Sequence, residues 1–118
     1  MSILNLFFKK KNSTKVDVQV LPTEAYQKAI KDNQILLVDV RTPGEYRQGH
    51  IAKAINLNIF NRGAFKSHFE KIARNTPVYL YCRSGQRSQQ AARLLAKMGF
   101  TQLFDLRGGY IAWQRDIQ

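Results

Sequence analysis

The stretch from residue 78 to residue 99 constrains the fold of this chain more than any other. Val78-Tyr79-Leu80-Tyr81 is an apolar, β-prone run that ends on Cys82, the only cysteine of the sequence. A short loop with one glycine and two arginines follows, and then a helical pattern of apolar residues runs to Gly99. The sequence therefore predicts a strand, a loop and a helix N-terminus around one thiol.

Strand and helix patterns alternate along the rest of the chain. Apolar runs predict strands over residues 16–20, 35–40, 55–59 and 103–106. Helical spacing and turn residues predict helices that begin at Thr23 as N-cap, lie between Asn61 and Asn75, and start at Tyr110. Residues 41–46 predict a turn, which a short helical piece follows to Gln48-Gly49. Such alternation is typical of βαβ units. We expect an α/β fold, with a mostly parallel sheet and helices on both faces.

The first fifteen residues differ from the remainder. Met1–Phe8 is apolar and Lys9–Lys15 is polar and basic, whereas regular patterning begins at Val16. We therefore expect an N-terminal extension over 1–15 and one domain over 16–118. The apolar run is far too short to span a membrane. With its lysines it could make a weak contact with an anionic membrane surface, and the simpler alternative is a mobile tail.

Composition limits the function classes. Nineteen basic and eight acidic residues give a net charge of +11, which attracts anions in general. No nucleic-acid-binding motif accompanies that charge, so we expect no nucleic-acid partner. A lone cysteine cannot form an internal disulfide and fits a reducing, cytoplasmic location. One cysteine and two histidines do not make a metal-ligand set, and we expect no metal or other cofactor.

The loop after Cys82 has the residues of an anion-binding cradle. Consecutive backbone N–H groups can point inward, the helix that we expect to begin near Ser88 adds its positive end, and Gly85 permits an unusual backbone angle. Arg83 and Arg87 add positive charge. These features favour a thiolate and hold an anionic substrate beside it. A buried cysteine often serves only as a small apolar side chain, but a cysteine in that role does not require an anion-binding loop after it.

Four motifs, in order along the chain, resemble those of single-domain rhodaneses, which are sulfurtransferases. They are Cys82-Arg83-Ser84-Gly85-Gln86-Arg87-Ser88, Leu37-Val38-Asp39-Val40-Arg41 with Pro43, Glu45 and Tyr46, Gly49-His50-Ile51 with Ala54-Ile55-Asn56, and Leu106 with Gly108-Gly109 and Trp113. The resemblance covers residues 16 to 117. It implies a rhodanese-like fold with a central five-stranded sheet.

The resemblance also implies roles for particular residues. Cys82 would be the nucleophile that accepts a sulfane sulfur and becomes a persulfide. The loop residues Arg83, Ser84, Gly85, Gln86, Arg87 and Ser88 would hold the substrate anion, with Arg83 at the rim and Arg87 closing the loop. Asp39 and Arg41 would support the loop. The donor would be a small anion such as thiosulfate, or a persulfide. The acceptor would be cyanide, a thiol or a partner protein's thiol.

Two alternative functions compete with sulfur transfer, and the sequence departs from the family motif at one position. Related phosphatases place five residues between cysteine and arginine, and only four separate Cys82 from Arg87, so phosphatase activity is disfavoured. A sulfur carrier or docking module that acts on a partner protein is a second hypothesis. Lys53 stands where the family usually has glycine, which would alter the turn after His50. We expect His50 itself to hydrogen-bond that turn rather than to act in catalysis.

Overall fold

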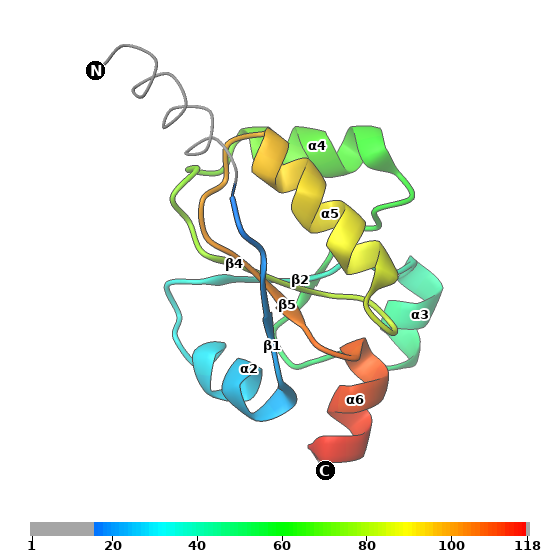
Figure 1. Cartoon of the computed structure of the whole chain (residues 1–118). Coiled ribbons are helices and arrows are strands. Elements are labelled where there is room, and N and C mark those ends of the chain that lie inside the picture. The colour runs from blue at the N-terminus through cyan, green and yellow to red at the C-terminus, as the bar shows by residue number, and fades with distance from the viewer. Residues whose placement is uncertain (1–15, 118) are drawn as a thin grey trace, which may run out of the picture.

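Strands and helices alternate strictly along residues 16–117, the part of the chain that this computed structural model describes (Figure 1). The strands are β1 (Gln19–Leu21), β2 (Leu36–Asp39), β3 (Ile55–Asn56), β4 (Val78–Tyr81) and β5 (Leu103–Leu106). The helices are α2 (Thr23–Ala29), α3 (Pro43–Gln48), α4 (Arg62–Glu70), α5 (Gln86–Lys97) and α6 (Gly109–Asp116). The α/β class is confirmed. The extension predicted over 1–15 and its membrane contact lie outside the described residues.

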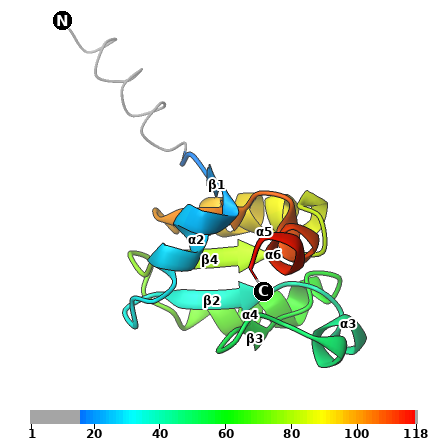
Figure 2. The ribbon, with the colours of Figure 1, turned by 90° about the horizontal axis from the view of Figure 1, so that it is seen from below.

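The five strands form one parallel sheet in the order β1-β5-β4-β2-β3. Figure 2 shows β2 and β4 side by side and pointing in the same direction. All four side chains of β4 are buried, because β4 lies at the centre with helices on both faces. All strands therefore end at the same edge of the sheet, and Cys82 follows directly after the central strand.

Two apolar clusters hold the helices against the sheet. One contains Phe65 and Phe69 of α4 and Leu95 of α5, packed on Val38 and Leu80 of the sheet. The other, on the opposite face, surrounds Tyr26 of α2 and includes residues of α6. Aromatic side chains buried this completely stabilise a fold by about 3–5 kcal/mol each when compared with alanine. Among the described helices, none has the length and apolar character to cross a membrane.

Several predicted elements are shorter in the structure. The strand predicted over 16–20 begins three residues later and ends one residue later, at Gln19–Leu21. Val20 is 41 % exposed because β1 is an edge strand. The strand predicted over 55–59 ends at Asn56, since Asn58 accepts a hydrogen bond from the Phe60 N–H and begins a turn.

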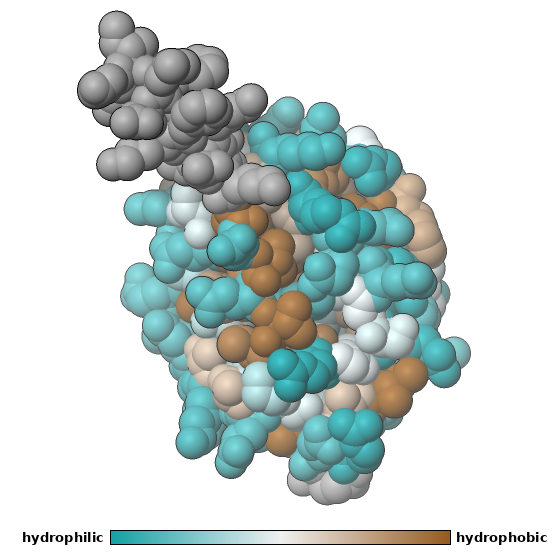
Figure 3. Space-filling model, viewed as in Figure 1, coloured by the Kyte–Doolittle hydropathy of each residue, from teal (hydrophilic) through white to brown (hydrophobic). Residues whose placement is uncertain are grey.

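On the face seen in Figure 3, apolar patches are scattered among hydrophilic residues.

Helix boundaries also differ from expectation. Pro22, not Thr23, stands at the N-cap of α2, and the Thr23 hydroxyl instead donates a hydrogen bond to Asp116 over 2.9 Å. That bond joins α2 to α6, a partner 93 residues away that local patterning does not reveal. The helix predicted between Asn61 and Asn75 begins as expected, with the Asn61 side chain as its N-cap. It ends earlier than expected, at Glu70.

The turn after His50 contains a strained residue. Lys53 has a φ of 74° and is the only residue other than glycine with a positive φ within the described chain. This is the position at which the resembling family usually has glycine, so lysine occupies a turn built for glycine. The His50 ring stacks on Tyr46 with ring centres 3.7 Å apart, and its Nδ1 lies 2.8 Å from the Tyr46 carbonyl oxygen. His50 therefore contacts α3, which precedes it, whereas the sequence predicts a hydrogen bond to the turn that follows.

Candidate active site

Cys82 lies at the carboxyl end of the sheet and is only 1 % exposed. Its side chain faces the same side of the sheet as α5, in the core cluster of Leu80 and Ala91. The Gly85 N–H donates a hydrogen bond to the Cys82 sulfur over 3.0 Å, and the Ser88 hydroxyl oxygen lies 3.4 Å from the same atom. The loop therefore turns around the sulfur and directs polar hydrogens at it.

Helix α5 begins two residues earlier than the sequence predicts. Its N-cap is Gly85, with a φ of 128°, and its first residue is Gln86 rather than Ser88. A side chain at Gly85 would meet no atom within 4 Å, so this position favours glycine for its backbone angle and not for space. The early start brings the positive end of the helix close to the sulfur. Partial positive charge there stabilises a thiolate or a bound anion.

Ser88 is the polar side chain closest to the sulfur. It is fully buried, and its hydroxyl donates a hydrogen bond to the Gly85 carbonyl over 3.1 Å. A hydroxyl has one hydrogen and two acceptor positions. When Cys82 is a thiol, the S–H can donate to Ser88. When Cys82 is a thiolate, the Ser88 hydroxyl can rotate and donate to the sulfur instead. Ser88 can therefore form a hydrogen bond with Cys82 in both the thiol and the thiolate state.

The start of α6 holds the loop from the other side. The Tyr110 N–H donates to the Cys82 carbonyl over 2.8 Å, and the Ile111 N–H donates to the Arg83 carbonyl over 3.1 Å. A Cβ at Gly109 would stand 2.5 Å from the Arg83 oxygen, closer than real contacts allow. Gly109 is thus needed for close packing at the site. Gly108-Gly109 belongs to the fourth sequence motif, and two glycines directly before a helix are the signal that points to this close packing.

The two loop arginines have different surroundings. Arg83 is exposed at the rim, where the sequence analysis placed it. Arg87 donates two hydrogen bonds to the Glu45 carboxylate, over 2.7 and 2.9 Å, and lies over the Phe60 ring. These hydrogen bonds lower the pKa of Glu45 to about 2. The charge of Arg87 is therefore compensated by Glu45, a residue to which the sequence analysis assigned no role, and the pair joins the loop to α3.

Asp39 and Arg41 form a buried ion pair beside the site. The Arg41 guanidinium lies 2.6 Å from the Asp39 carboxylate and also donates to the Gly49 carbonyl over 2.7 Å. Burial alone would lower the pKa of Arg41, but the hydrogen bonds and charge of Asp39 outweigh it and raise the pKa. The guanidinium also lies over the rings of Tyr81 and Tyr110. The pair thus braces β4 and α6 on either side of the loop.

A small hollow of about 210 Å³ adjoins the loop on the side of α3 and α6. Its lining includes Arg41, Glu45 and Arg83, together with Tyr110 of α6. The guanidinium of Arg83 gives it a positively charged side, which suits a small anion. Within residues 16–117, no three His, Cys, Asp or Glu side chains come together in a way that could hold a metal ion.

Comparison with known proteins identifies the class that this fold and loop define. The family model described as rhodanese-like domain matches residues 22–116. The chain therefore belongs to the rhodanese-like domain family. It is 37 % identical over 99 residues to a protein named sulfurtransferase from Allochromatium vinosum, which covers 83 % of this chain and 90 % of the relative.

Two further comparisons agree with this assignment. The chain is 32 % identical over 96 residues to the thiosulfate sulfurtransferase GlpE of Coxiella burnetii, covering 81 % of this chain and 86 % of the relative. A crystal structure of a rhodanese-related protein from Thermoplasma volcanium superposes with a TM-score of 0.71 at 25 % identity, covering 84 % of this chain and 93 % of that protein. The rhodanese-like fold, expected from the motifs, is confirmed.

Proposed function

We propose that this protein is a sulfurtransferase that carries a sulfane sulfur on Cys82. The observation that supports this most directly is the hydrogen bond from the Gly85 N–H to the Cys82 sulfur at the positive end of α5. Relatives named sulfurtransferase and thiosulfate sulfurtransferase support the reaction class and favour thiosulfate as the donor.

The reaction has two halves. In the first, the Cys82 thiolate attacks the outer sulfur of thiosulfate, the S–S bond of the donor breaks, and sulfite leaves with the bonding electron pair. Cys82 becomes a persulfide. In the second half, a thiolate or cyanide attacks the terminal sulfur, and Cys82 departs as a thiolate. The product is a new persulfide or thiocyanate. Cys82 is the nucleophile in the first half and the leaving group in the second, so the scheme is ping-pong with a persulfide intermediate.

The loop stabilises the negative charges that occur in both halves of the reaction. The Gly85 N–H and the Ser88 hydroxyl face the sulfur, so they stabilise its negative charge as a thiolate or persulfide. Arg83, exposed at the rim, attracts the anionic donor. Arg87 is already paired with Glu45 and acts by holding the loop rather than by binding the donor.

Intact-protein mass after incubation with thiosulfate tests the proposal, with wild type beside Cys82→Ser. We expect a gain of one sulfur atom that is absent in the variant and is removed by cyanide or dithiothreitol. If thiosulfate leaves the mass unchanged but a low-molecular-weight persulfide adds the sulfur, the donor assignment is wrong and the carrier role of Cys82 stands. If neither reagent loads Cys82, the function is wrong.

A second candidate is transfer to the thiol of a partner protein. Two large apolar side chains next to the loop favour it: Phe60 is 66 % exposed beside Arg87, and Ile111 is 42 % exposed beside Arg83. Exposed apolar residues of this kind are common in protein interfaces. The test compares wild type with Phe60→Ser in the second-order rates of sulfur transfer to a small thiol and to a protein thiol. An unchanged rate with small thiols and a reduced rate with a protein acceptor would support docking.

A further inference from the structure

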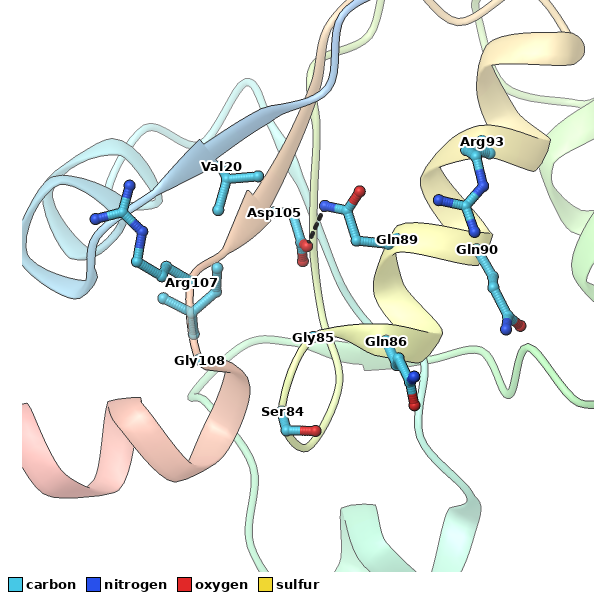
Figure 4. A pocket seen from close by; sticks show the side chains of 11 residues that line it. Val20, Ser84, Gly85, Gln86, Gln89, Gln90, Arg93, Asp105, Arg107 and Gly108 are labelled. Carbon is cyan, nitrogen blue, oxygen red and sulfur yellow. Dashed lines mark hydrogen bonds between the residues drawn. The ribbon is translucent and has the colours of Figure 1, made fainter.

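A second and larger hollow, of about 550 Å³, lies between β1, β5 and the first half of α5 (Figure 4). The loop residues Ser84, Gly85 and Gln86 form one of its walls. Cys82 does not line it, and neither do Arg83 and Arg87. The hollow is therefore separated from the sulfur by the loop itself. A molecule bound in it would contact the loop from behind and would not be the reacting substrate.

A buried carboxyl group lines this hollow. Asp105 is 2 % exposed, and its Oδ2 accepts a hydrogen bond from the Gln89 side chain over 2.7 Å. Its Oδ1 has no hydrogen-bond partner among the described residues. Burial raises the pKa of Asp105, and the polar groups around it, among them the Gln89 side chain that donates to Oδ2, act in the opposite direction. A buried polar oxygen without a partner is uncommon in folded proteins and calls for a ligand or water.

Two arginines stand at the ends of the same hollow. Figure 4 shows Arg107 on one side of the Asp105–Gln89 pair and Arg93 on the other. Both are exposed, and neither forms an ion pair with an acidic residue of the described chain. Asp105 is the only acidic residue in the lining. The hollow therefore combines two available positive charges with one buried hydrogen-bonding site.

We propose that this hollow binds a small organic anion that carries an uncharged hydrogen-bond donor, and that its binding changes the reactivity of Cys82. The anionic group would pair with Arg93 or Arg107, and an amide or hydroxyl donor would bind Asp105. An ammonium donor suits the site less well, because the two guanidinium groups repel it. The size of the hollow lies in the range of small-molecule sites, which is about 300–1,000 Å³.

The effect on Cys82 follows from two shared residues. Gly85 lines the hollow and also donates the hydrogen bond to the sulfur. Gln89, which holds Asp105, directly follows Ser88, whose hydroxyl lies 3.4 Å from the sulfur. A molecule that moves Gln89 or presses on Gly85 alters the groups that face the sulfur. Binding and reactivity are therefore coupled through the N-terminus of α5.

Binding is tested on Cys82→Ser protein, which cannot transfer sulfur, so the result is independent of the proposed function. The probes are N-acetylglutamate, with carboxylates and an amide, and adenosine monophosphate, with a phosphate and ring donors. Backbone amide NMR shifts at Val20, Gln89 and Arg107 would report binding, with a dissociation constant of about 0.1–10 mM. Binding of only one probe identifies a carboxylate or a phosphate as the anionic group.

Charge variants locate the site. Arg93→Gln and Arg107→Gln should each weaken binding several-fold, and Lys97→Gln should not. Lys97 is an exposed cation one turn from Arg93 on α5 and does not line the hollow, so it is a matched control. Asp105→Asn should weaken binding while its NMR spectrum shows an intact fold. Equal weakening by Lys97→Gln, or equal affinity for inorganic phosphate, would overturn the proposal, as would no shift with either probe.

Coupling has its own measurement, the rate of Cys82 alkylation by iodoacetamide in the otherwise unmodified protein. A saturating probe should change this rate at least twofold in wild type and leave it unchanged in Arg93→Gln/Arg107→Gln protein at the same probe concentration. An unchanged rate in wild type at saturation would refute the coupling half of the proposal, even where binding is observed.

Discussion

The carboxylate of Glu45 binds the guanidinium of Arg87 through two hydrogen bonds, of 2.7 and 2.9 Å. Glu45 also accepts from the Thr42 N–H in the capping box that begins α3. One carboxylate thus joins the start of a helix to the loop around Cys82, although the two residues are 42 positions apart. The loop conformation depends on α3 through this pair.

Replacement of Glu45 by Gln should destabilise the protein at neutral pH by about 1 kcal/mol, since the pair is partly exposed. The pKa of Glu45 is depressed to about 2 in the folded protein, so its stabilising effect is full above the ordinary value of 4.5. That effect is lost as the pH falls from 4.5 toward 2. Urea unfolding of wild type and Glu45→Gln as a function of pH measures the difference in their free energies of unfolding.

The matched control for this experiment is Glu70→Gln. Glu70 is exposed at the end of α4, and none of the ion pairs of the described chain includes it. Its replacement should change the free energy of unfolding by less than about 0.5 kcal/mol. A Glu45→Gln effect that persists unchanged at pH values near 2 would contradict the role given to the Arg87 pair.

Gly109→Ala should disable the site while the sheet stays folded. The new Cβ would stand 2.5 Å from the Arg83 oxygen and 2.6 Å from the Cys82 oxygen, so the loop or α6 must move. A displacement of this kind in an active site reduces the rate by about 100-fold. The rate of sulfur loading measures the effect. Gly44→Ala is the control, since its Cβ meets nothing within 4 Å, and a loss equal to that of Gly109→Ala would refute the argument.

Ser88→Ala should slow alkylation of Cys82 at neutral pH by about three- to tenfold, because the thiolate loses a neutral hydrogen-bond donor. The substitution removes only the hydroxyl oxygen of a fully buried side chain, so the fold should be retained. Iodoacetamide kinetics at fixed pH measure the change, and Ser67→Ala, on the exposed surface of α4, should leave the rate unaltered. Equal rates in wild type and Ser88→Ala would show that Ser88 does not interact with the reactive sulfur.

Lys53→Gly should stabilise the protein by about 0.5–1 kcal/mol, because glycine adopts the φ of 74° without strain. The gain is partly offset by the greater freedom of glycine in the unfolded chain. Lys66→Gly, at an exposed position within α4, should instead cost about 1 kcal/mol. Urea denaturation of both variants distinguishes backbone strain at residue 53 from a general effect of removing lysine. Destabilisation by Lys53→Gly would contradict the claim that the backbone of Lys53 is strained.

The amino-acid sequence by itself determined the fold class, the central strand and the position of Cys82. Val78–Tyr81 and Leu103–Leu106 are strands with the boundaries predicted, because both are short runs of mainly apolar residues between turn residues. The order of strands, loops and helices follows from local patterning. The motif around Cys82 was likewise readable, since its residues are contiguous.

Tertiary structure decided the contacts between residues distant along the chain. Three contacts show this: the pair of Arg87 with Glu45, the bonds from the α6 amides to the loop carbonyls, and the bond from Thr23 to Asp116. They join segments separated by 28 to 93 positions. The hollow around Asp105 likewise forms only where β1, β5 and α5 meet. Periodicity shows which face of an element is apolar, but which polar groups meet across elements depends on how the sheet and helices pack.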